Sequence, residues 1–137
     1  MAWDVSLFKF SQRYRTLEEI PHDERLSDLG SLKEVQGAVT AVFPETDWTD
    51  PHWGIFDSVL GSIEFNVGTD DPVQSLGLHV RAGDAVVDGI LLLCEQMDCQ
   101  AIDVGDGSFL EQSDDPARGL QKWRAYRDQI LTQGKTS

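Results

Sequence analysis

The chain has 137 residues and a formal net charge of −13, and its hydrophobic fraction of 40% is ordinary for a folded protein. This length and composition predict a single domain over residues 1–137 and exclude an acidic disordered chain. The sequence pI near 4.3 argues against binding to nucleic acids or anionic membranes, because a negative surface repels both.

The negative charge is concentrated in the middle of the chain. Between Glu45 and Asp115 there are sixteen Asp and Glu residues and one basic residue, Arg81. The remaining residues hold eight acids and ten Lys or Arg. The acidic segment can serve solubility alone, or it can attract a basic protein partner.

Hydropathy and cysteine content indicate a cytoplasmic protein. The longest apolar run, Ile90–Cys94, is far shorter than a membrane span, and the first residues lack the basic and apolar regions of a secretory signal. Two cysteines, Cys94 and Cys99, are too few for a disulfide framework. Cys94 falls on the apolar side of a predicted helix, so we expect buried, reduced thiols.

The N-terminal part of the chain predicts one strand and a long connection. Trp3, Val5 and Leu7 alternate with other residues in the segment 2–10, which is the period of a half-buried strand. The polar stretch 11–30 has no sustained period, so we expect a loop with a short turn at 17–20.

A helix is predicted between Ser31 and Pro44. Ser31 and Glu34 have the spacing of a capping box, in which each side chain accepts a hydrogen bond from the other residue's backbone N–H. Pro44 ends the helix, because the residue before a proline is displaced from helical geometry. We expect the next segment, 45–52, to be a loop that carries Trp48.

Three strands are predicted in the middle of the chain, at about 53–58, 62–67 and 75–81. A tight turn at Leu60–Gly61 joins the first two, and the turn sequence at 68–72 precedes the third. These short segments with tight connections favour antiparallel pairing.

The last part of the chain predicts two helices separated by short strands. Asp84 suits the N-cap of the first helix, and short strands follow at about 101–104 and 109–110. Asp115 with Pro116 begins the final helix. The expected buried side chains of that helix are Leu120, Trp123, Ile130 and Leu131. We expect Arg118, Lys122, Arg124 or Arg127 to pair with carboxylates of the central segment.

This element order predicts the α+β class. We expect a two-layer sandwich in which three helices cover one face of a mainly antiparallel sheet of five or six strands. The opposite face of the sheet would then remain partly open.

The alternation of residues in the central strands assigns side chains to that open face. Ile63, Phe65 and Val67 point toward the helices, so Glu64 and Asn66 point the other way. The turn at 60–61 pairs odd with even positions, which brings three residues of the preceding strand to the same side. The candidate surface consists of Trp53, Ile55, Asp57, Glu64, Asn66, His79 and Arg81.

Three interpretations of this surface stay open. It can be a solvated sheet face with cross-strand ion pairs, or a protein-binding patch. It can also be an acid/base site in which Glu64 and His79 act as a pair and Arg81 contacts an anion.

We predict neither a metal site nor a cofactor. The three histidines, His22, His52 and His79, lack zinc spacing. The acidic pairs Asp70–Asp71 and Asp103 with Asp106 do not match a calcium loop and are explained better by turn formation. No phosphate-binding glycine motif is present.

Short motifs in the centre of the chain carry a resemblance to other proteins. They are Trp53–Gly54, Ser62–Asn66, Asp71–Val73 and Leu78–Arg81. In this central half the chain resembles small acidic bacterial proteins of uncharacterised function, a resemblance that implies no catalytic residue. Proteins of this size and charge are also similar in general character to immunity proteins that neutralise toxins.

Together these features predict a non-enzymatic protein-binding module, immunity-like or regulatory, that uses its open sheet face to bind a basic protein. The alternative is a small enzyme with the acid/base pair Glu64–His79 and with Arg81 as the anion contact. A homodimer is also compatible, with cations of the final helix against an acidic patch of a second copy.

Overall fold

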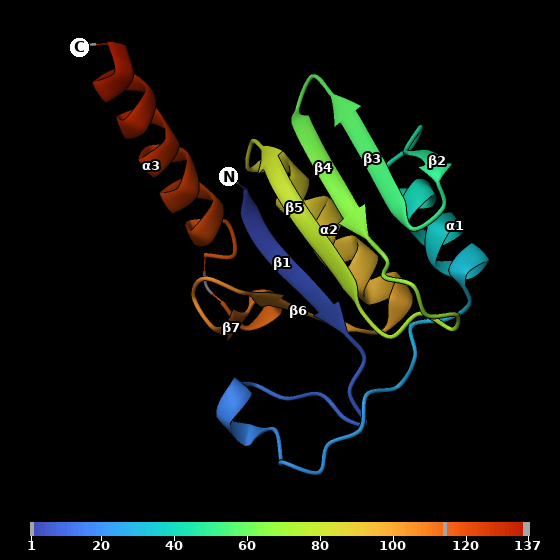
Figure 1. Cartoon of the computed structure of the whole chain (residues 1–137). Coiled ribbons are helices and arrows are strands. Elements are labelled where there is room, and N and C mark those ends of the chain that lie inside the picture. The colour runs from blue at the N-terminus through green and yellow to red at the C-terminus, as the bar shows by residue number, and fades with distance from the viewer. Residues whose placement is uncertain (1, 114, 136–137) are drawn as a thin grey trace.

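The computed structural model describes residues 2–113 and 115–135, with the side chains of the last helix described as far as Gln129. Its seven-stranded sheet has the order β2-β3-β4-β5-β1-β6-β7 (Figure 1), and neighbouring strands are antiparallel. The strands are β1 Trp3–Phe8, β2 Asp47–Asp50, β3 Trp53–Ser58, β4 Gly61–Asn66, β5 Leu76–Ala82, β6 Gln100–Asp103 and β7 Ser108–Phe109. The helices are α1 Leu32–Val42, α2 Ala85–Met97 and α3 Arg118–Lys135, with 3-10 turns η1 Leu17–Glu19 and η2 Leu110–Gln112.

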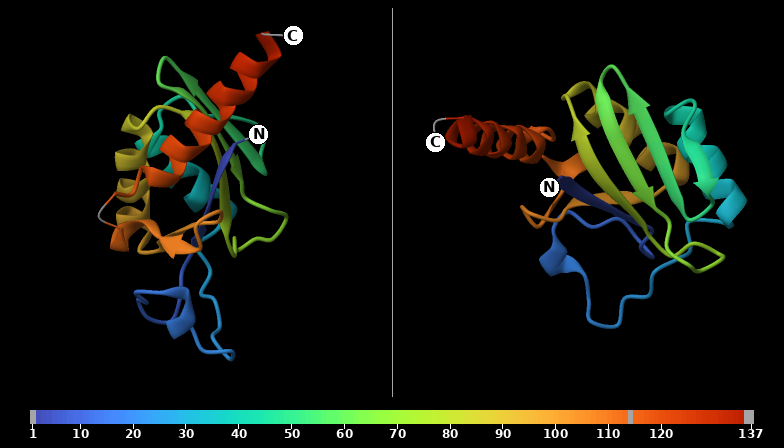
Figure 2. Two further views of the ribbon diagram at one scale, coloured as in Figure 1. Left: turned by 90° about the vertical axis from the view of Figure 1, so that its left-hand side faces the viewer. Right: turned by 45° about the horizontal axis from the view of Figure 1, so that its top comes forward.

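Two helices, α1 and α2, cover one face of the sheet and leave the other face bare (Figure 2). The side chains of Ile63, Phe65, Leu78 and Val80 point to the covered face and are fully buried. The α+β class and the orientation of the central strands are therefore confirmed. The cysteines Cys94 and Cys99 are also confirmed as buried free thiols.

The capping box expected at the start of α1 is confirmed. Ser31 Oγ accepts a hydrogen bond from Glu34 N at 3.1 Å, and Glu34 Oε1 accepts one from Ser31 N at 3.0 Å. Asp71 Oδ1 accepts a further bond from Leu32 N at 3.0 Å. A turn residue distant in sequence thus satisfies one of the free N–H groups of the first helical turn.

The expectation of five or six strands is wrong, because the segment predicted as a loop before β3 forms β2. This four-residue strand lies at the sheet edge and pairs with β3 through Asp47 opposite Ile55 and Asp50 opposite Trp53. Trp48 points to the other side, and its ring lies where a side chain on Gly54 would stand. The missing side chain at Gly54 is what lets the indole pack against the sheet.

The expectation that all three helices lie on one face is wrong for α3. This helix begins beside β1 and projects away from the sheet edge (Figures 1 and 2). Its first turns are anchored by Leu120, which is fully buried, and by Trp123, which is 9% exposed. The expected burial of Ile130 and Leu131 concerns side chains outside the described part of the chain.

The basic side of α3 contacts the acidic middle of the chain, as the charge distribution predicts. Arg124 Nη1 lies 2.6 Å from Asp84 Oδ1, and Gln121 Nε2 donates to Asp84 Oδ2 at 2.8 Å. These two bonds lower the pKa of Asp84, the bond from Gln121 contributing most. Asp84 occupies the N-cap position of α2 but makes no capping bond there, because its carboxylate binds α3 instead.

The connection between β1 and α1 is a long loop at the lower end of the sheet, with the expected turn present as η1 (Figure 1). It is fixed by isolated bridges of Lys9 to Ser27 and of Gly30 to Val73. None of the helices in the described residues is both long and apolar enough to cross a membrane.

Candidate functional site

The bare face of the sheet brings together all seven residues of the candidate surface. The strand register arranges them in cross-strand rows. The central row is Ile55, Glu64, His79 and Asp4, running from β3 through β4 and β5 to β1. Beside it stand the rows Trp53, Asn66, Gly77 and Ser6 on one side, and Asp57, Ser62 and Arg81 on the other.

Glu64 is the centre of a hydrogen-bonded group on this face. Its Oε2 atom accepts from Arg81 Nη1 at 2.7 Å, and its Oε1 atom accepts from Trp53 Nε1 at 3.3 Å. The bond from Arg81, more than that from Trp53, holds the pKa of Glu64 below its ordinary value of 4.5. Glu64 is therefore an anion at neutral pH and serves as an acceptor.

His79 makes its own contacts beside this group. Its Nδ1 atom lies 2.7 Å from Asp4 Oδ1, and its ring stacks on the indole of Trp53 with centroids 5.5 Å apart at 18°. Trp53 thus contacts both members of the proposed acid/base pair. The carboxylate bonded to His79 is Asp4, whereas Glu64 is bonded to Arg81.

Sequence reasoning missed five polar residues of this face, which are Asp4 and Ser6 of β1, Ser62 of β4, and Asp47 and Asp50 of β2. Asp4 alternates with Trp3 and Val5, which assigns it to the polar side of β1, but the pairing of β1 with β5 is not visible in the sequence. Ser62 is two residues from Glu64 in β4, so the alternation of that strand places it on the same face. Asp47 and Asp50 belong to β2, whose segment the sequence predicts as a loop.

The face is negatively charged and partly apolar. Carboxylates from four strands stand on it, against the two basic side chains His79 and Arg81. The carboxylates belong to Asp4, Asp47, Asp50, Asp57 and Glu64. Ile55, in the central row of this face, is 43% exposed. The apolar residues Val59 and Leu60 are exposed at the turn between β3 and β4.

Of three cavities in the described part of the chain, none is lined by Glu64, His79 or Arg81. The first, of about 370 Å³, lies between the start of α3 and the first residues of β1, which β6 does not pair, with Trp3, Val104 and Trp123 in its wall. Asp4 lines it as well, so the central row ends at this cavity. A second cavity, of about 340 Å³, lies beside Cys94 and Cys99.

The acidic turns act as structural elements. Asp103 Oδ1 accepts from Asp106 N at 3.1 Å, and Asp103 Oδ2 accepts from Trp3 Nε1 at 3.1 Å. Both carboxylate oxygens of the buried Asp103 thus accept hydrogen bonds within the protein, one of them in the turn to Asp106 that the sequence predicts. Within residues 2–113 and 115–135, no three His, Cys, Asp or Glu side chains are grouped so as to hold a metal ion.

No protein-family model, curated protein or solved structure matches this chain. The chemistry of the face therefore follows from its geometry. The face presents anionic acceptors around an indole and an exposed aliphatic side chain, and none of the three cavities lies under its polar centre. Such a surface can bind cationic groups by hydrogen bonds, by ion pairs and by contact with the aromatic ring.

Proposed function

We propose that this protein is a non-enzymatic binding module whose bare sheet face docks a basic protein. The observation that carries the proposal is the grouping of five carboxylates around Trp53 and Ile55 on a face that no helix covers. Charge of this sign speeds the approach of a basic partner, and the apolar side chains supply contact area once it is bound.

The partner that fits this face presents Arg or Lys side chains around a small apolar patch. Its cations would meet Asp57, Asp47 and Asp50 on β2 and β3, because the two basic residues of the face, His79 and Arg81, stand on β5. Arg can also stack on the ring of Trp53. Ile55 would contact the apolar part of the partner.

Neutralisation of such a partner, in the manner of an immunity protein, is one form of this function, and regulation of it is another. Neutralisation and regulation both require a surface complementary to the partner in charge and shape, and neither requires a chemical reaction at the face. We place this activity in the cytoplasm, and we propose no role in binding nucleic acid or membranes, because the net charge of −13 opposes both.

The alternative proposal is a small enzyme that uses Glu64, His79 and Arg81. The close contact of His79 with Asp4, at 2.7 Å, favours it, because a carboxylate orients an imidazole in many acid/base sites. Two features oppose it: Glu64 is bonded to Arg81, and Glu64, His79 and Arg81 line none of the cavities described above, of which the first reaches only Asp4. Catalytic sites are usually concave.

Affinity capture from the native host tests the proposal. The immobilised protein should retain a basic protein at low ionic strength and release it as salt is raised. The matched variant is Ile55→Asn, which leaves the net charge unchanged but removes the exposed aliphatic contact, and it should retain less of the partner. Recovery of no specific partner at low salt, or capture of only a second copy of the chain, would contradict the proposal.

A further inference from the structure

The second cavity lies beside two thiols that play no part in the proposed function. Cys94 is in the last turn of α2, and Cys99 is the residue before β6. Asp98 between them has a left-handed backbone, with φ of 53°, and ends the helix. Cys99 N then donates to Cys94 O at 3.0 Å. The chain therefore folds back and brings two cysteines five positions apart onto the same cavity.

The cavity is large enough for a small molecule. It measures about 340 Å³, which is within the range of small-molecule sites. Its wall contains both cysteines together with Leu91, Leu110, Arg13 and Glu111. Both thiols are free, and the side chains are almost wholly buried, at 4% and 2% exposure. Both residues line this cavity.

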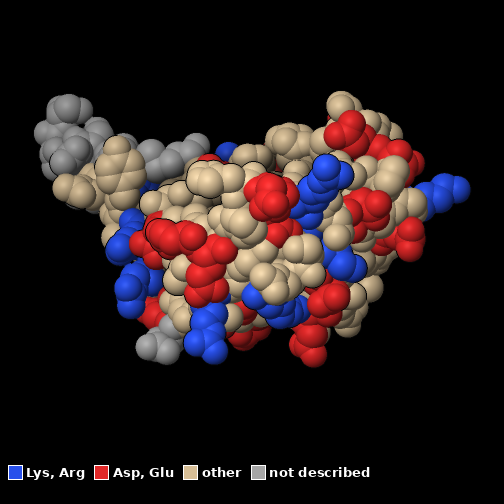
Figure 3. All heavy atoms as spheres, turned by 90° about the horizontal axis from the view of Figure 1, so that it is seen from below, with Lys and Arg blue, Asp and Glu red and all other residues tan. Residues whose placement is uncertain are grey.

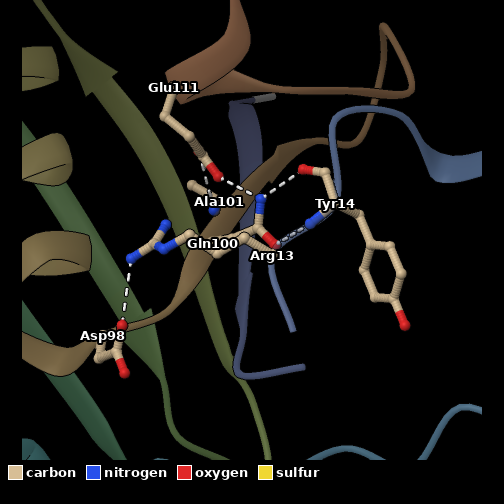
Figure 4. A network of polar contacts seen from close by, with 6 residues as sticks. All are labelled: Arg13, Tyr14, Asp98, Gln100, Ala101 and Glu111. Atoms are coloured by element: carbon tan, nitrogen blue, oxygen red, sulfur yellow. Dashed lines mark hydrogen bonds and ion pairs between the residues drawn. The ribbon is translucent and has the colours of Figure 1, made fainter. Parts of the chain in front are cut away.

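The wall around Cys99 is held by a polar network (Figure 4). Gln100, next to Cys99, donates from Nε2 to Glu111 Oε1 and to Tyr14 O, both at 2.8 Å, and accepts from Tyr14 N at 3.0 Å. Arg13 Nη2 donates at 3.2 Å to Oδ1 of Asp98, the residue before Cys99. Three segments distant in sequence are thereby fastened around the two thiols.

The two thiols are not equivalent. The hydrogen bond with Cys99, then burial, raise the pKa of the Cys94 thiol well above its ordinary value. Cys94 is therefore held as a neutral thiol, and Cys99 takes the role of the attacking sulfur in this site. Arg13 lines the cavity and also a smaller one of about 110 Å³ that Cys99 borders, so a cation stands on the approach to Cys99.

We propose that Cys94 and Cys99 form a redox-active dithiol site that undergoes exchange with a low-molecular-weight disulfide in this cavity. The Cys99 thiolate attacks one sulfur of the disulfide RSSR, forms a mixed disulfide and displaces RS⁻, which takes up the proton that Cys99 released. The Cys94 sulfur then attacks the Cys99 sulfur and displaces the second RS⁻, which takes the Cys94 proton. The sum is two protein thiols and RSSR converted into one protein disulfide and two RSH.

Oxidised glutathione is the probe that tests this site. The reduced, folded wild-type protein should lose two hydrogens in intact mass and two thiols in a count made after unfolding, and dithiothreitol should restore both. The same chain in denaturant shows that the probe is active. Retention of both thiols by the folded protein, while the unfolded chain is oxidised, would overturn the proposal.

Two variants distinguish the roles of the thiols. Cys94→Ala should stop at the mixed disulfide and gain the mass of one glutathionyl group. Cys99→Ala should react on the order of tenfold more slowly, because burial still raises the pKa of the Cys94 thiol once the bond with Cys99 is gone. Equal rates for the two variants would contradict the assignment of Cys99 as the attacking thiol. The wild-type mass measurement decides the existence of the site even where a variant fails to fold.

Discussion

Glu64 shows at the scale of one residue how the polar face is kept charged. Because Arg81 holds the pKa of Glu64 below 4.5, the folded state binds a proton at Glu64 less readily than the unfolded chain does. The stabilisation by Glu64 is therefore fully present above the unfolded pKa and is lost as the pH falls through the lower, folded pKa.

The variant Glu64→Gln measures this contribution. We expect it to reduce the free energy of unfolding by at most about 1 kcal/mol at neutral pH, because both partners are partly exposed. Denaturant titrations at a series of pH values should show the difference from wild type constant above about pH 5 and shrinking below it. A difference that does not change with pH would contradict the role given to the Arg81 bond.

Gly119 illustrates a requirement that the sequence does not display. It lies in the first turn of α3 against the buried pair of Trp3 Nε1 and Asp103 Oδ2, and a Cβ on Gly119 would overlap both atoms. The expected effect of Gly119→Ala is a loss of stability of about 1–3 kcal/mol, since the hydrogen bond of a buried carboxylate must be displaced.

Gly37→Ala is the matched control for this prediction. Gly37 lies within α1, where an added Cβ meets nothing within 4 Å, so alanine should stabilise the helix by about 0.5–1 kcal/mol. Thermal or denaturant unfolding of the two variants should therefore shift in opposite directions. A shift in the same direction for both would contradict the packing of Gly119.

At the scale of elements, sequence motifs predicted the features that depend on neighbouring residues in the chain, such as helix ends and the faces of strands. The capping box and Pro44 mark the ends of α1, and alternation assigns the faces of β3 and β4. The tight turn between these strands is at Val59–Leu60, one residue before the predicted position, so odd residues still pair with even ones as expected. That register is why the seven residues of the candidate surface could be assigned to one face from the sequence alone.

Long-range pairing could not be predicted in the same way. β1 lies between β5 and β6 in the sheet, although these strands are far from it in the chain, so Asp4 was not expected beside His79. β2 has four residues and little apolar content, which gives no strand pattern. The apolar side of α3 predicts that the helix packs, but it does not say whether against a face or an edge.

Truncation after Asp115 tests how α3 contributes. Leu120 and Trp123 are buried beside β1, so we expect the loss of the helix to reduce the free energy of unfolding by more than about 3 kcal/mol, at any salt concentration. The single variant Arg124→Ala should have a smaller, salt-sensitive effect, because its pair with Asp84 is partly exposed. A truncated protein that stays equally stable and monomeric would make α3 an appendage whose charges serve binding.

At the scale of the whole molecule, folding redistributes the charge of the sequence. Seen from below, acidic and basic side chains are interspersed on the surface (Figure 3). This end of the molecule, opposite the β3–β4 turn, therefore carries no large patch of one charge. The carboxylates of the bare face are grouped, in contrast, with few basic neighbours. The dithiol cavity lies at α2, on the covered side of the sheet, so its chemistry can be tested apart from binding.

The central claim, that the bare face binds a basic partner, is tested most directly by the association rate constant of the captured partner. Asp57→Lys reverses one charge on the face, and Asp88→Lys makes the same change on the exposed side of α2. We predict that Asp57→Lys slows association about threefold to tenfold, whereas Asp88→Lys has a much weaker effect, and that the difference diminishes as salt is raised. Equal effects of the two variants, or rates insensitive to both, would contradict the account.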